Sequence, residues 1–273
     1  MVYEKAFAKL NLALEVGKEI DGYHQVQNLM IPIDLYDELF FQRSEEDAIE
    51  CDISIENNIC FKAIQLFKEY FHISSGVTIT LNKKIPIMAG LAGGSTDAAA
   101  TLRGLNRLFE VHATQEELYS LACQLGSDVP FFLNVQAAMC TGRGEIVQPI
   151  DLNFQNVSFL IIKPNFGLST KEVYEHYTYD GISKSVTIQK LIDALRNKDF
   201  DLIDEYIFND LEDTALKLKP ELDALFHRID ALSYIPHISG SGPSIFILNA
   251  KSIDLENIKA LDDTLALYLV HTL

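Results

Sequence analysis

The chain has 273 residues, of which 48% are hydrophobic and 22% are charged, and its formal net charge is −17. A chain of this size and apolar content can form one large domain, or two closely packed domains, around a sizeable core. The strongly negative charge argues against broad binding to nucleic acid or to an anionic membrane, although a small site can still be locally positive.

The N-terminal 55 residues are predicted to form β-strands. Residues 7–16 alternate partly between apolar and polar side chains, and residues 30–42 follow a turn at Asp21 and Gly22. A third strand is predicted over residues 48–55. The N-terminus holds no apolar run long enough for a signal peptide or a membrane span, so we expect a cytoplasmic protein.

Helices and one strand are predicted in the middle of the chain. Apolar residues recur at helical spacing over residues 57–72 and 95–109, whereas residues 76–86 alternate as in a strand. Residues 114–126 are predicted as a further helix, because Thr114 and Glu117 have the spacing of an N-terminal capping box.

The C-terminal half combines strands with a long helical region. Strands are predicted over residues 137–142 and 157–164, and residues 170–232 are mainly helical. Further strand pattern follows over residues 233–250. A helix comes next, and a last strand over residues 266–273 closes the chain. This order of elements predicts an α+β fold.

No flexible linker separates the two halves of the chain. We expect an N-terminal domain over residues 1–155 and a C-terminal domain over residues 156–273. The four cysteines, at positions 51, 60, 123 and 140, form no Cys-x-x-Cys pair, so we expect reduced and mostly buried thiols rather than a zinc site or a redox pair.

Residues 86–99, PIMAGLAGGSTDAA, concentrate small residues in front of a predicted helix. Gly90, Gly93 and Gly94 have no Cβ atom, so the backbone here can adopt positive φ angles and approach a ligand closely. Ser95 is a suitable N-cap for the helix, and free N–H groups at a helix N-terminus bind anions. The stretch therefore predicts a phosphate-binding loop, with a tight strand-to-helix turn as the alternative. It matches neither the Walker A motif nor the dinucleotide fingerprint.

Five further motifs accompany this stretch in order along the chain: AKLN (8–11), DGYH (21–24), GSDVPFF (126–132), GRGE (142–145) and SGSGPS (239–244). Together they resemble the GHMP superfamily of small-molecule kinases, named for galactokinase, homoserine kinase, mevalonate kinase and phosphomevalonate kinase. The set is most similar to the kinases of that superfamily that act on a cytidine diphosphate-linked methylerythritol. The resemblance implies a two-lobed fold, with a ribosomal-protein-like α/β domain at the N-terminus and an α+β domain at the C-terminus.

The resemblance assigns the catalytic roles to Asp128 and Lys9. Asp128 would take the proton of the acceptor hydroxyl, and Lys9 would keep Asp128 ionised and stabilise the transferring phosphoryl group. Asn11 lies two residues after Lys9 on a predicted strand, so both side chains face the same way and Asn11 could bind the substrate. As alternatives, Asp128 could be an aspartate that only stabilises a turn, Lys9 a solvent-exposed lysine on a strand, and Asn11 a buried structural amide.

The acceptor site implied by the resemblance comes from two distant segments. Tyr23 would stack on a cytosine whose edge His24 reads, and Tyr174 would cover its other face. Thr170 would lie near the substrate phosphates. The alternatives are loop side chains without a ligand.

The ATP site implied by the resemblance is formed mainly by backbone. It comprises the phosphate loop, two residues near the adenine and a third glycine motif: Pro86, Gly90, Leu91, Gly93, Gly94, Ser95 and Thr96; Asn58 and Lys83; and Gly240, Ser241 and Gly242. A helix cap and a strand-end lysine are the alternatives for the adenine pair, and a plain turn for the third motif. Mg²⁺ would arrive with ATP, and its protein ligands are not assigned. Asp97 would either point away from the phosphates or approach a metal bound with them.

The function expected from this resemblance is ATP-dependent phosphorylation of a cytidine diphosphate-linked polyol in non-mevalonate isoprenoid precursor synthesis. The alternatives are a kinase of the same fold for another small alcohol and a nucleotide-binding regulator without activity. RNA binding is disfavoured because no basic stripe is present. We expect a monomer or weak homodimer without nucleic acid or membrane partners. Phe7, where the family commonly has proline, leaves room for a different acceptor.

Overall fold

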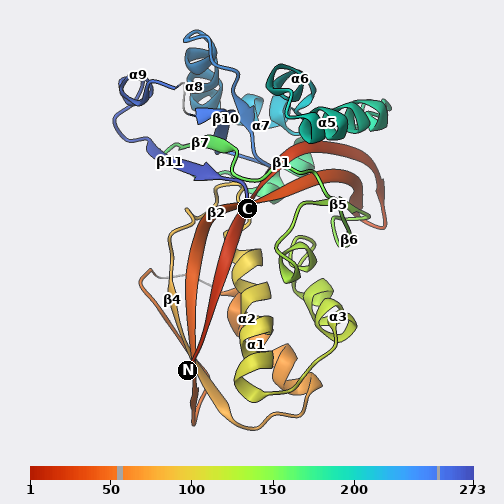
Figure 1. Cartoon of the computed structure of the whole chain (residues 1–273), viewed down its shortest axis with the longest axis vertical. Helices are drawn as coiled ribbons and strands as arrows, with labels where there is room; N and C mark the ends of the chain where they lie inside the picture. The colour runs from red at the N-terminus through yellow and green to blue at the C-terminus, as the bar shows by residue number, and fades with distance from the viewer. Residues whose placement is uncertain (54–57, 251–252) are drawn as a thin grey trace.

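A computed structural model describes residues 1–53, 58–250 and 253–273. Two β-sheets form the framework of two lobes (Figure 1). The first sheet has the strand order β3-β4-β2-β1-β8, with β5 paired to β2 and to β6. Its strands are β1 (Val2–Ile20), β2 (Tyr23–Ser44), β3 (Ala48–Cys51), β4 (Gly76–Asn82), β5 (Ala138–Thr141), β6 (Ile146–Pro149) and β8 (Phe208–Asn209).

The second sheet belongs to the C-terminal half of the chain and has the strand order β11-β7-β10-β9. Its strands are β7 (Ser158–Lys163), β9 (His237–Ile238), β10 (Ile245–Leu248) and β11 (Ala266–His271). The two sheets are joined through an antiparallel bridge between Ile33 and Thr272. Because β8 pairs in parallel with β1, a segment of the C-terminal half also completes the first sheet.

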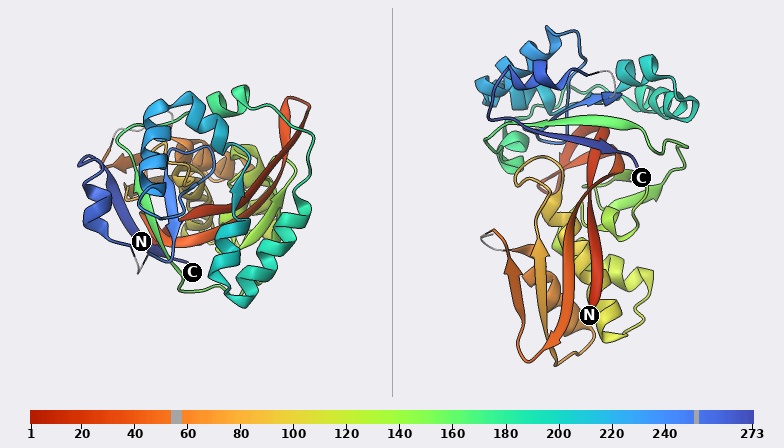
Figure 2. Two further views of the ribbon diagram at one scale, coloured as in Figure 1. Left: turned by 90° about the horizontal axis from the view of Figure 1, so that it is seen from above. Right: turned by 60° about the vertical axis from the view of Figure 1, so that its left-hand side comes forward.

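Helices cover both sheets (Figure 2). They are α1 (Ile59–Tyr70), α2 (Gly93–Phe109), α3 (Gln115–Leu125), the 3-10 helix η1 (Pro130–Leu133), α4 (Thr170–His176), α5 (Ser185–Asn197), α6 (Phe200–Tyr206), α7 (Glu212–Leu218), α8 (Pro220–Asp230) and α9 (Leu255–Lys259). The core of the first lobe lies between the sheet and helices α1 to α3, where alternate residues of β4 and the predicted apolar face of α2 are buried. Burial of these faces holds the N-terminus of α2 against the sheet.

The two long strands β1 and β2 run from the first lobe into the second (Figure 1). Their register shifts between Phe7 and Lys9 and again between Asn11 and Ala13. β-Bulges of this kind change the direction of side chains and are frequent beside active sites. Lys9 and Asn11 therefore lie on a stretch of β1 that is bounded by two irregularities.

The α+β fold is confirmed, and most predicted elements occur where the sequence placed them. Thr114 and Glu117 form the predicted capping box at the N-terminus of α3. The short strands β6 and β8 and the helix η1 were not predicted. Strand β3 ends at Cys51, before the predicted end at residue 55, and residues 54–57 of that prediction lie outside the described residues.

All four cysteines are free, and two of them, Cys60 and Cys140, are buried. In the described ranges no helix is both long and apolar enough to span a membrane. The second sheet starts at Ser158, close to the expected domain boundary at residue 155. The pairing of β8 with β1 shows that the C-terminal half contributes to both sheets, so we keep the boundary as a proposal.

Candidate active site

A cleft of about 1030 Å³ opens around the glycine-rich loop and the bulged part of β1. Most of the residues proposed from the sequence lie along its walls: Lys9, Asn11, Tyr23, His24, Asn58, Lys83, Pro86, Gly90, Gly93, Gly94, Ser95, Asp128, Thr170, Tyr174, Gly240 and Ser241. Three proposed residues do not line it. Leu91 and Thr96 are buried behind the loop, and Gly242 lies in the turn that follows Ser241.

The glycine-rich loop presents a helix N-terminus without a side-chain cap. Helix α2 begins at Gly93, and its N-cap is Ala92 in a left-handed conformation with φ of 57°. The prediction that Ser95 is the N-cap is therefore wrong, since Ser95 lies inside the first turn. Gly93, Gly94 and Ser95 of this turn line the cleft, and the N–H groups of a helix N-terminus attract phosphate.

Only Gly90 among the three loop glycines adopts a positive φ, of 72°. The expectation of positive φ is wrong for Gly93 and Gly94, because both already belong to the right-handed helix. A Cβ atom on Gly90 would lie 2.1 Å from the carbonyl oxygen of Ser239. On Gly94 its nearest protein neighbour would be Ile59 Cγ2, at 3.8 Å, so the protein alone does not require glycine there.

The third glycine motif packs against this loop. Ser239 Oγ donates a hydrogen bond of 3.1 Å to the carbonyl of Gly90, and a Cβ atom on Gly240 would lie 3.2 Å from Lys9 Nζ. Thr170 and Ser241 share a hydrogen bond of 2.8 Å between their hydroxyl groups. Asn209, which we did not predict, donates 2.7 Å to the carbonyl of Gly240. The sequence around Asn209 was predicted as mainly helical, and this pattern gave no indication of the contact.

Lys9 lines the cleft and is only 3% exposed. Its ammonium group donates to Asn11 Oδ1 and, at 2.6 Å, to the carbonyl of Gly90. The contact with Asn11 confirms that both side chains point the same way. Asn11 in turn donates 2.8 Å to Asn28, a second amide that the sequence reasoning missed. Burial lowers the pKa of Lys9 to about 8, and the Asp128 carboxylate acts in the opposite direction.

Asp128 is half-buried in the turn between α3 and η1 and faces the cleft. No ion pair within 4.0 Å joins it to Lys9 in the described part of the chain, so the two interact at longer range. Together with burial, the charge of Asp128 also raises the pKa of the Cys140 thiol. The carboxylate is thus near the Lys9 ammonium yet free to accept a proton from a ligand.

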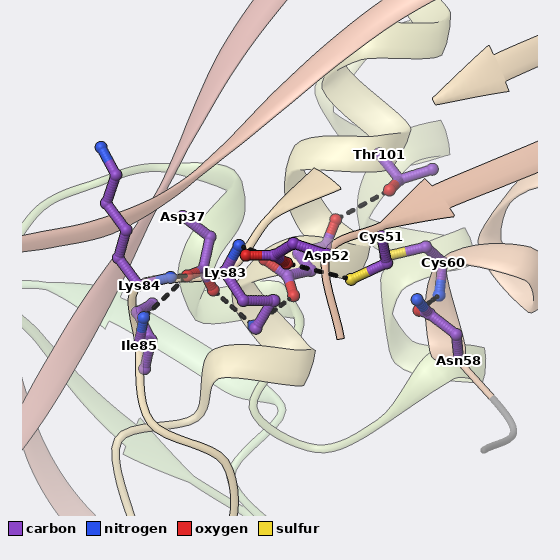
Figure 3. Close-up of polar contacts among 10 residues, drawn as sticks. Asp37, Cys51, Asp52, Asn58, Cys60, Lys83, Lys84, Ile85 and Thr101 are labelled. Carbon is purple, nitrogen blue, oxygen red and sulfur yellow. Dashed lines mark hydrogen bonds and ion pairs between the residues drawn. The ribbon is translucent and has the colours of Figure 1, made fainter. Parts of the chain in front are cut away.

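Lys83 is held by two buried carboxylates at the base of the glycine-rich loop. Its ammonium group lies 2.5 Å from Asp37 Oδ2 and 2.7 Å from Asp97 Oδ2. Asp37 also accepts the backbone N–H groups of Lys84 and Ile85, at 2.5 and 2.8 Å, which fixes the chain between β4 and the loop (Figure 3). The sequence reasoning missed Asp37 because it lies within a predicted strand.

Asp97 carries an oxygen atom, Oδ1, that is buried without a hydrogen-bond partner among the described residues. Burial, and then the neighbouring Asp37, raises the pKa of Asp97 above its usual range, while Lys83 acts against this. The side chain forms an ion pair with Lys83, and both residues line the cleft beside the glycine-rich loop.

The opposite end of the cleft is aromatic. The ring centroids of His24 and Tyr174 lie 5.8 Å apart, and Tyr177 meets His24 edge-on at 5.6 Å. The tyrosine ring of Tyr23 is 53% exposed. The Nδ1 atom of His24 lies 2.9 Å from the carbonyl oxygen of Gly17, which can only accept, so Nδ1 carries the proton in the neutral ring. Its Nε2 atom is then a hydrogen-bond acceptor.

These features arrange three functions along one cleft. A helix N-terminus and an aromatic pair line the same cleft. Lys9 donates to the Gly90 carbonyl of the loop, and the charge of Asp128 acts on the pKa of both Lys9 and Tyr174. In the described ranges no group of three or more histidine, cysteine, aspartate or glutamate side chains could hold a metal ion. The arrangement suits group transfer between a phosphorylated donor and a base-bearing acceptor.

Comparison with known proteins identifies relatives over nearly the whole chain. The family model for the GHMP kinases N terminal domain matches residues 58–135. A 4-diphosphocytidyl-2-C-methyl-D-erythritol kinase of Clostridium perfringens is 40% identical over 252 residues, which cover 89% of this chain and 86% of that protein.

Solved structures give the same result for the fold. The crystal structure of a 4-(cytidine 5'-diphospho)-2C-methyl-D-erythritol kinase matches with a TM-score of 0.82 and 29% identity, over 99% of both chains. A homoserine kinase from Cytophaga hutchinsonii has a TM-score of 0.70 at 20% identity, over 98% of this chain and 94% of that one. At that identity the second match shows a shared fold alone.

Proposed function

The chain belongs to the 4-diphosphocytidyl-2-C-methyl-D-erythritol kinase family of GHMP kinases, and we infer that it transfers a phosphoryl group from ATP to the 2-hydroxyl of 4-diphosphocytidyl-2-C-methyl-D-erythritol. The reaction is a step of non-mevalonate isoprenoid precursor synthesis. The observation that carries this inference is the single cleft that Lys9 and Asp128 line together with the uncapped N-terminus of α2 and an aromatic pair.

We propose the chemistry of Asp128 and Lys9 from the family resemblance, and their positions support it. Asp128 accepts the proton of the 2-hydroxyl as the oxygen forms its bond to phosphorus and the bond to the leaving nucleoside diphosphate breaks. The Lys9 ammonium group stabilises negative charge on the transferring group, because it is buried in a water-poor part of the site. Its hydrogen bond to the Gly90 carbonyl keeps it beside the loop that would bind the phosphates.

ATP, the phosphoryl donor, would bind at the uncapped N-terminus of α2. The N–H groups of Gly93, Gly94 and Ser95 suit its phosphates, and Asn58 and Lys83 line the same end of the cleft, where the adenine would lie. We propose that Mg²⁺ binds mainly through the ATP phosphates. This fits the chain, since Mg²⁺ commonly takes few protein carboxylates and the described residues offer no acidic cluster.

The cytosine of the acceptor would lie at the aromatic end of the cleft. We propose that Tyr23 and Tyr174 cover its faces and that Nε2 of His24 accepts a hydrogen bond from the cytosine amino group. The proton on Nδ1, held by the Gly17 carbonyl, supports this direction of the bond. Uracil presents a carbonyl oxygen in place of that amino group and would leave two acceptors facing each other. Thr170, bound to Ser241, would then lie beside the acceptor phosphates.

We propose a cytoplasmic location, because both substrates are multiply charged nucleotides that do not cross membranes unaided. A monomer or weak homodimer remains the expected assembly. A kinase for another small alcohol and an inactive nucleotide-binding regulator remain the competing functions. The aromatic end of the cleft argues against the first, and the presence of both Lys9 and Asp128 argues against the second.

The proposed function is tested with an ATP-consumption assay on a panel of acceptor alcohols. The panel contains the cytidine diphosphate-linked methylerythritol, its uridine analogue, methylerythritol phosphate, homoserine and mevalonate. We expect turnover with the cytidine-linked acceptor and at least about 10-fold lower kcat/KM with the others. Acceptors without a base lose roughly 1–3 kcal/mol of stacking, and the uridine analogue leaves buried acceptors unpaired at a cost of roughly 1–3 kcal/mol. Equal use of an acceptor without a base would overturn the assignment of the substrate.

A further inference from the structure

The GRGE motif forms a loop, residues 142–145, that the functions assigned so far do not use. The loop joins the two halves of the acceptor site. The carbonyl of Gly142 accepts a hydrogen bond of 2.8 Å from the N–H of Val26, next to the segment that carries Tyr23 and His24. On its other side, a Cβ atom built on Gly144 would lie 3.6 Å from Asp128 Oδ1. The loop therefore spans the distance from the aromatic end to the carboxylate.

Arg143 projects from this loop into the cleft. Its Cζ atom lies 4.8 Å from the centre of the Tyr23 ring, so the guanidinium group covers one face of that ring. Its Nε atom is 3.8 Å from Glu145 Oε1, beyond hydrogen-bond distance, and Glu145 Oε2 instead accepts the backbone N–H of Arg143 at 2.6 Å. The guanidinium group donates no hydrogen bond within the part of the chain that the structure describes.

Two of the other cations along the described walls of the cleft are already engaged. Lys9 donates to Asn11 and Gly90, and Lys83 is held by Asp37 and Asp97. Lys171 lies 3.7 Å from Glu175, and both side chains are largely exposed. Arg143 and Lys171 are therefore the two cations on the described walls whose donors are available to a ligand, and of these Arg143 is the less exposed and lies over the Tyr23 ring.

The acceptor brings a diphosphate into this end of the cleft. The protein has a net charge of −17, so such an anion needs a local cation to bind. A guanidinium group matches phosphate oxygens with parallel N–H donors and can at the same time stack on an aromatic ring. The stack on Tyr23 holds the group beside the position proposed for the cytosine, to which the diphosphate is attached through the ribose.

We propose that Arg143 binds the diphosphate of the cytidine diphosphate-linked acceptor, and that it makes the enzyme select a cytidine diphosphate over the bare nucleoside. This inference rests on the proposed function, because it takes the acceptor from there. Arg143 is then a residue for substrate specificity, whereas Tyr23 and His24 select the base.

The test measures the binding of cytidine, CMP and CDP to the wild type and to Arg143→Met, by isothermal titration or as competitive inhibition. Methionine keeps an apolar contact with Tyr23 and removes the charge. We expect the Kd for CDP to rise at least about 10-fold, the low end for a charge-assisted hydrogen bond, and the Kd for cytidine to change less than about twofold. Arg143→Lys should restore part of the affinity for CDP.

Lys171→Met is the matched control, since it also removes one positive charge from the rim of the cleft. We expect it to raise the Kd for CDP less than about threefold. Equal losses for cytidine and CDP in Arg143→Met would overturn the proposal, because Arg143 would then only support Tyr23. Unchanged CDP affinity would overturn it as well. A wild type that binds neither cytidine nor CDP would overturn the proposed function itself, and this inference with it.

Discussion

Lys9 and Gly90 are 81 positions apart in the chain, yet Lys9 Nζ donates a hydrogen bond of 2.6 Å to the Gly90 carbonyl. Gly90 can take this position because it has a positive φ and no Cβ atom, which would otherwise meet Ser239 at 2.1 Å. The cation proposed for catalysis is thus positioned directly by the loop proposed to bind the phosphates. A change in the loop should therefore affect the chemical step as well as nucleotide binding.

The first prediction concerns Asp128 and Lys9 as a pair. Asp128→Asn should lower kcat by about 10²-fold or more, because the proton acceptor is lost, while the affinity for ATP changes only a few-fold. Lys9→Ala should lower kcat to a similar extent. Since the two residues act on one step, the double variant should lose much less than the product of the two single losses. Steady-state kinetics of the four proteins measure this, and multiplicative losses would exclude joint action.

The fold and the position of the site followed from local signals in the sequence, whereas contacts between distant segments did not. Periodic apolar residues predicted α1, α2 and β4, and the capping box located the start of α3. Asp37 looked like an ordinary strand residue, because its partners Lys83 and Ile85 lie 46 and 48 positions further along the chain. The same holds for Asn209, whose role depends on the Gly240 carbonyl.

The N-cap of α2 shows why a local rule can fail at a ligand-binding loop. Ser95 is a good capping residue by type, but the chain turns through Ala92 in the left-handed region, and the helix starts two residues earlier. Positive φ at Ala92 and Met88 costs free energy that no sequence pattern reveals. The result is a helix N-terminus whose N–H groups stay available for phosphate.

The second prediction compares two glycines of the loop. Gly90→Ala should destabilise the protein by at least about 1–2 kcal/mol, because alanine is strained at positive φ and its Cβ atom would overlap Ser239. Gly94→Ala should leave the stability nearly unchanged, because the protein leaves room there. It should nevertheless raise the KM for ATP, since the new methyl group faces the cleft.

Thermal unfolding and ATP kinetics on both variants separate these two roles. Gly94→Ala with normal stability and an unchanged KM for ATP would show that the first turn of α2 does not approach the phosphates.

The third prediction follows from the pKa of Lys9, which burial lowers from 10.5 to about 8. In the free enzyme the ammonium group loses its proton as the pH rises through about 8, so kcat/KM should fall about 10-fold per pH unit above that value. Bound phosphates favour the ammonium form, so the fall in kcat should begin at higher pH. A profile of kcat/KM that stays flat up to pH 10 would contradict the assigned role of Lys9.

The same pKa shift has a consequence for stability with a definite sign. Between pH 8 and pH 10.5 the unfolded chain keeps a proton on Lys9 that the folded chain has lost. The unfolding free energy should therefore gain a contribution from this group as the pH rises through that range, of up to about 1.4 kcal/mol per pH unit. Lys9→Met should remove this contribution, which denaturant unfolding at several pH values measures.

The fourth prediction concerns Tyr23. Tyr23→Ala should raise the KM for the cytidine-linked acceptor about 10-fold or more, because one stacking face contributes roughly 1–3 kcal/mol. Tyr23→Phe should have little effect, since the ring and its contact with Arg143 remain. The KM for ATP should change little in either variant, because the phosphate loop lies at the other end of the cleft. An unchanged acceptor KM in Tyr23→Ala would remove Tyr23 from the cytosine site.

The fifth prediction tests the central claim most directly. The reaction of the wild type with ATP and 4-diphosphocytidyl-2-C-methyl-D-erythritol is followed by ³¹P NMR, with Asp128→Asn as the control. We predict one new phosphomonoester resonance, equimolar ADP and an intact diphosphate in the acceptor, with almost no product in the variant. Release of inorganic phosphate without a phosphomonoester, or phosphorylation at the diphosphate in place of the 2-hydroxyl, would contradict the account.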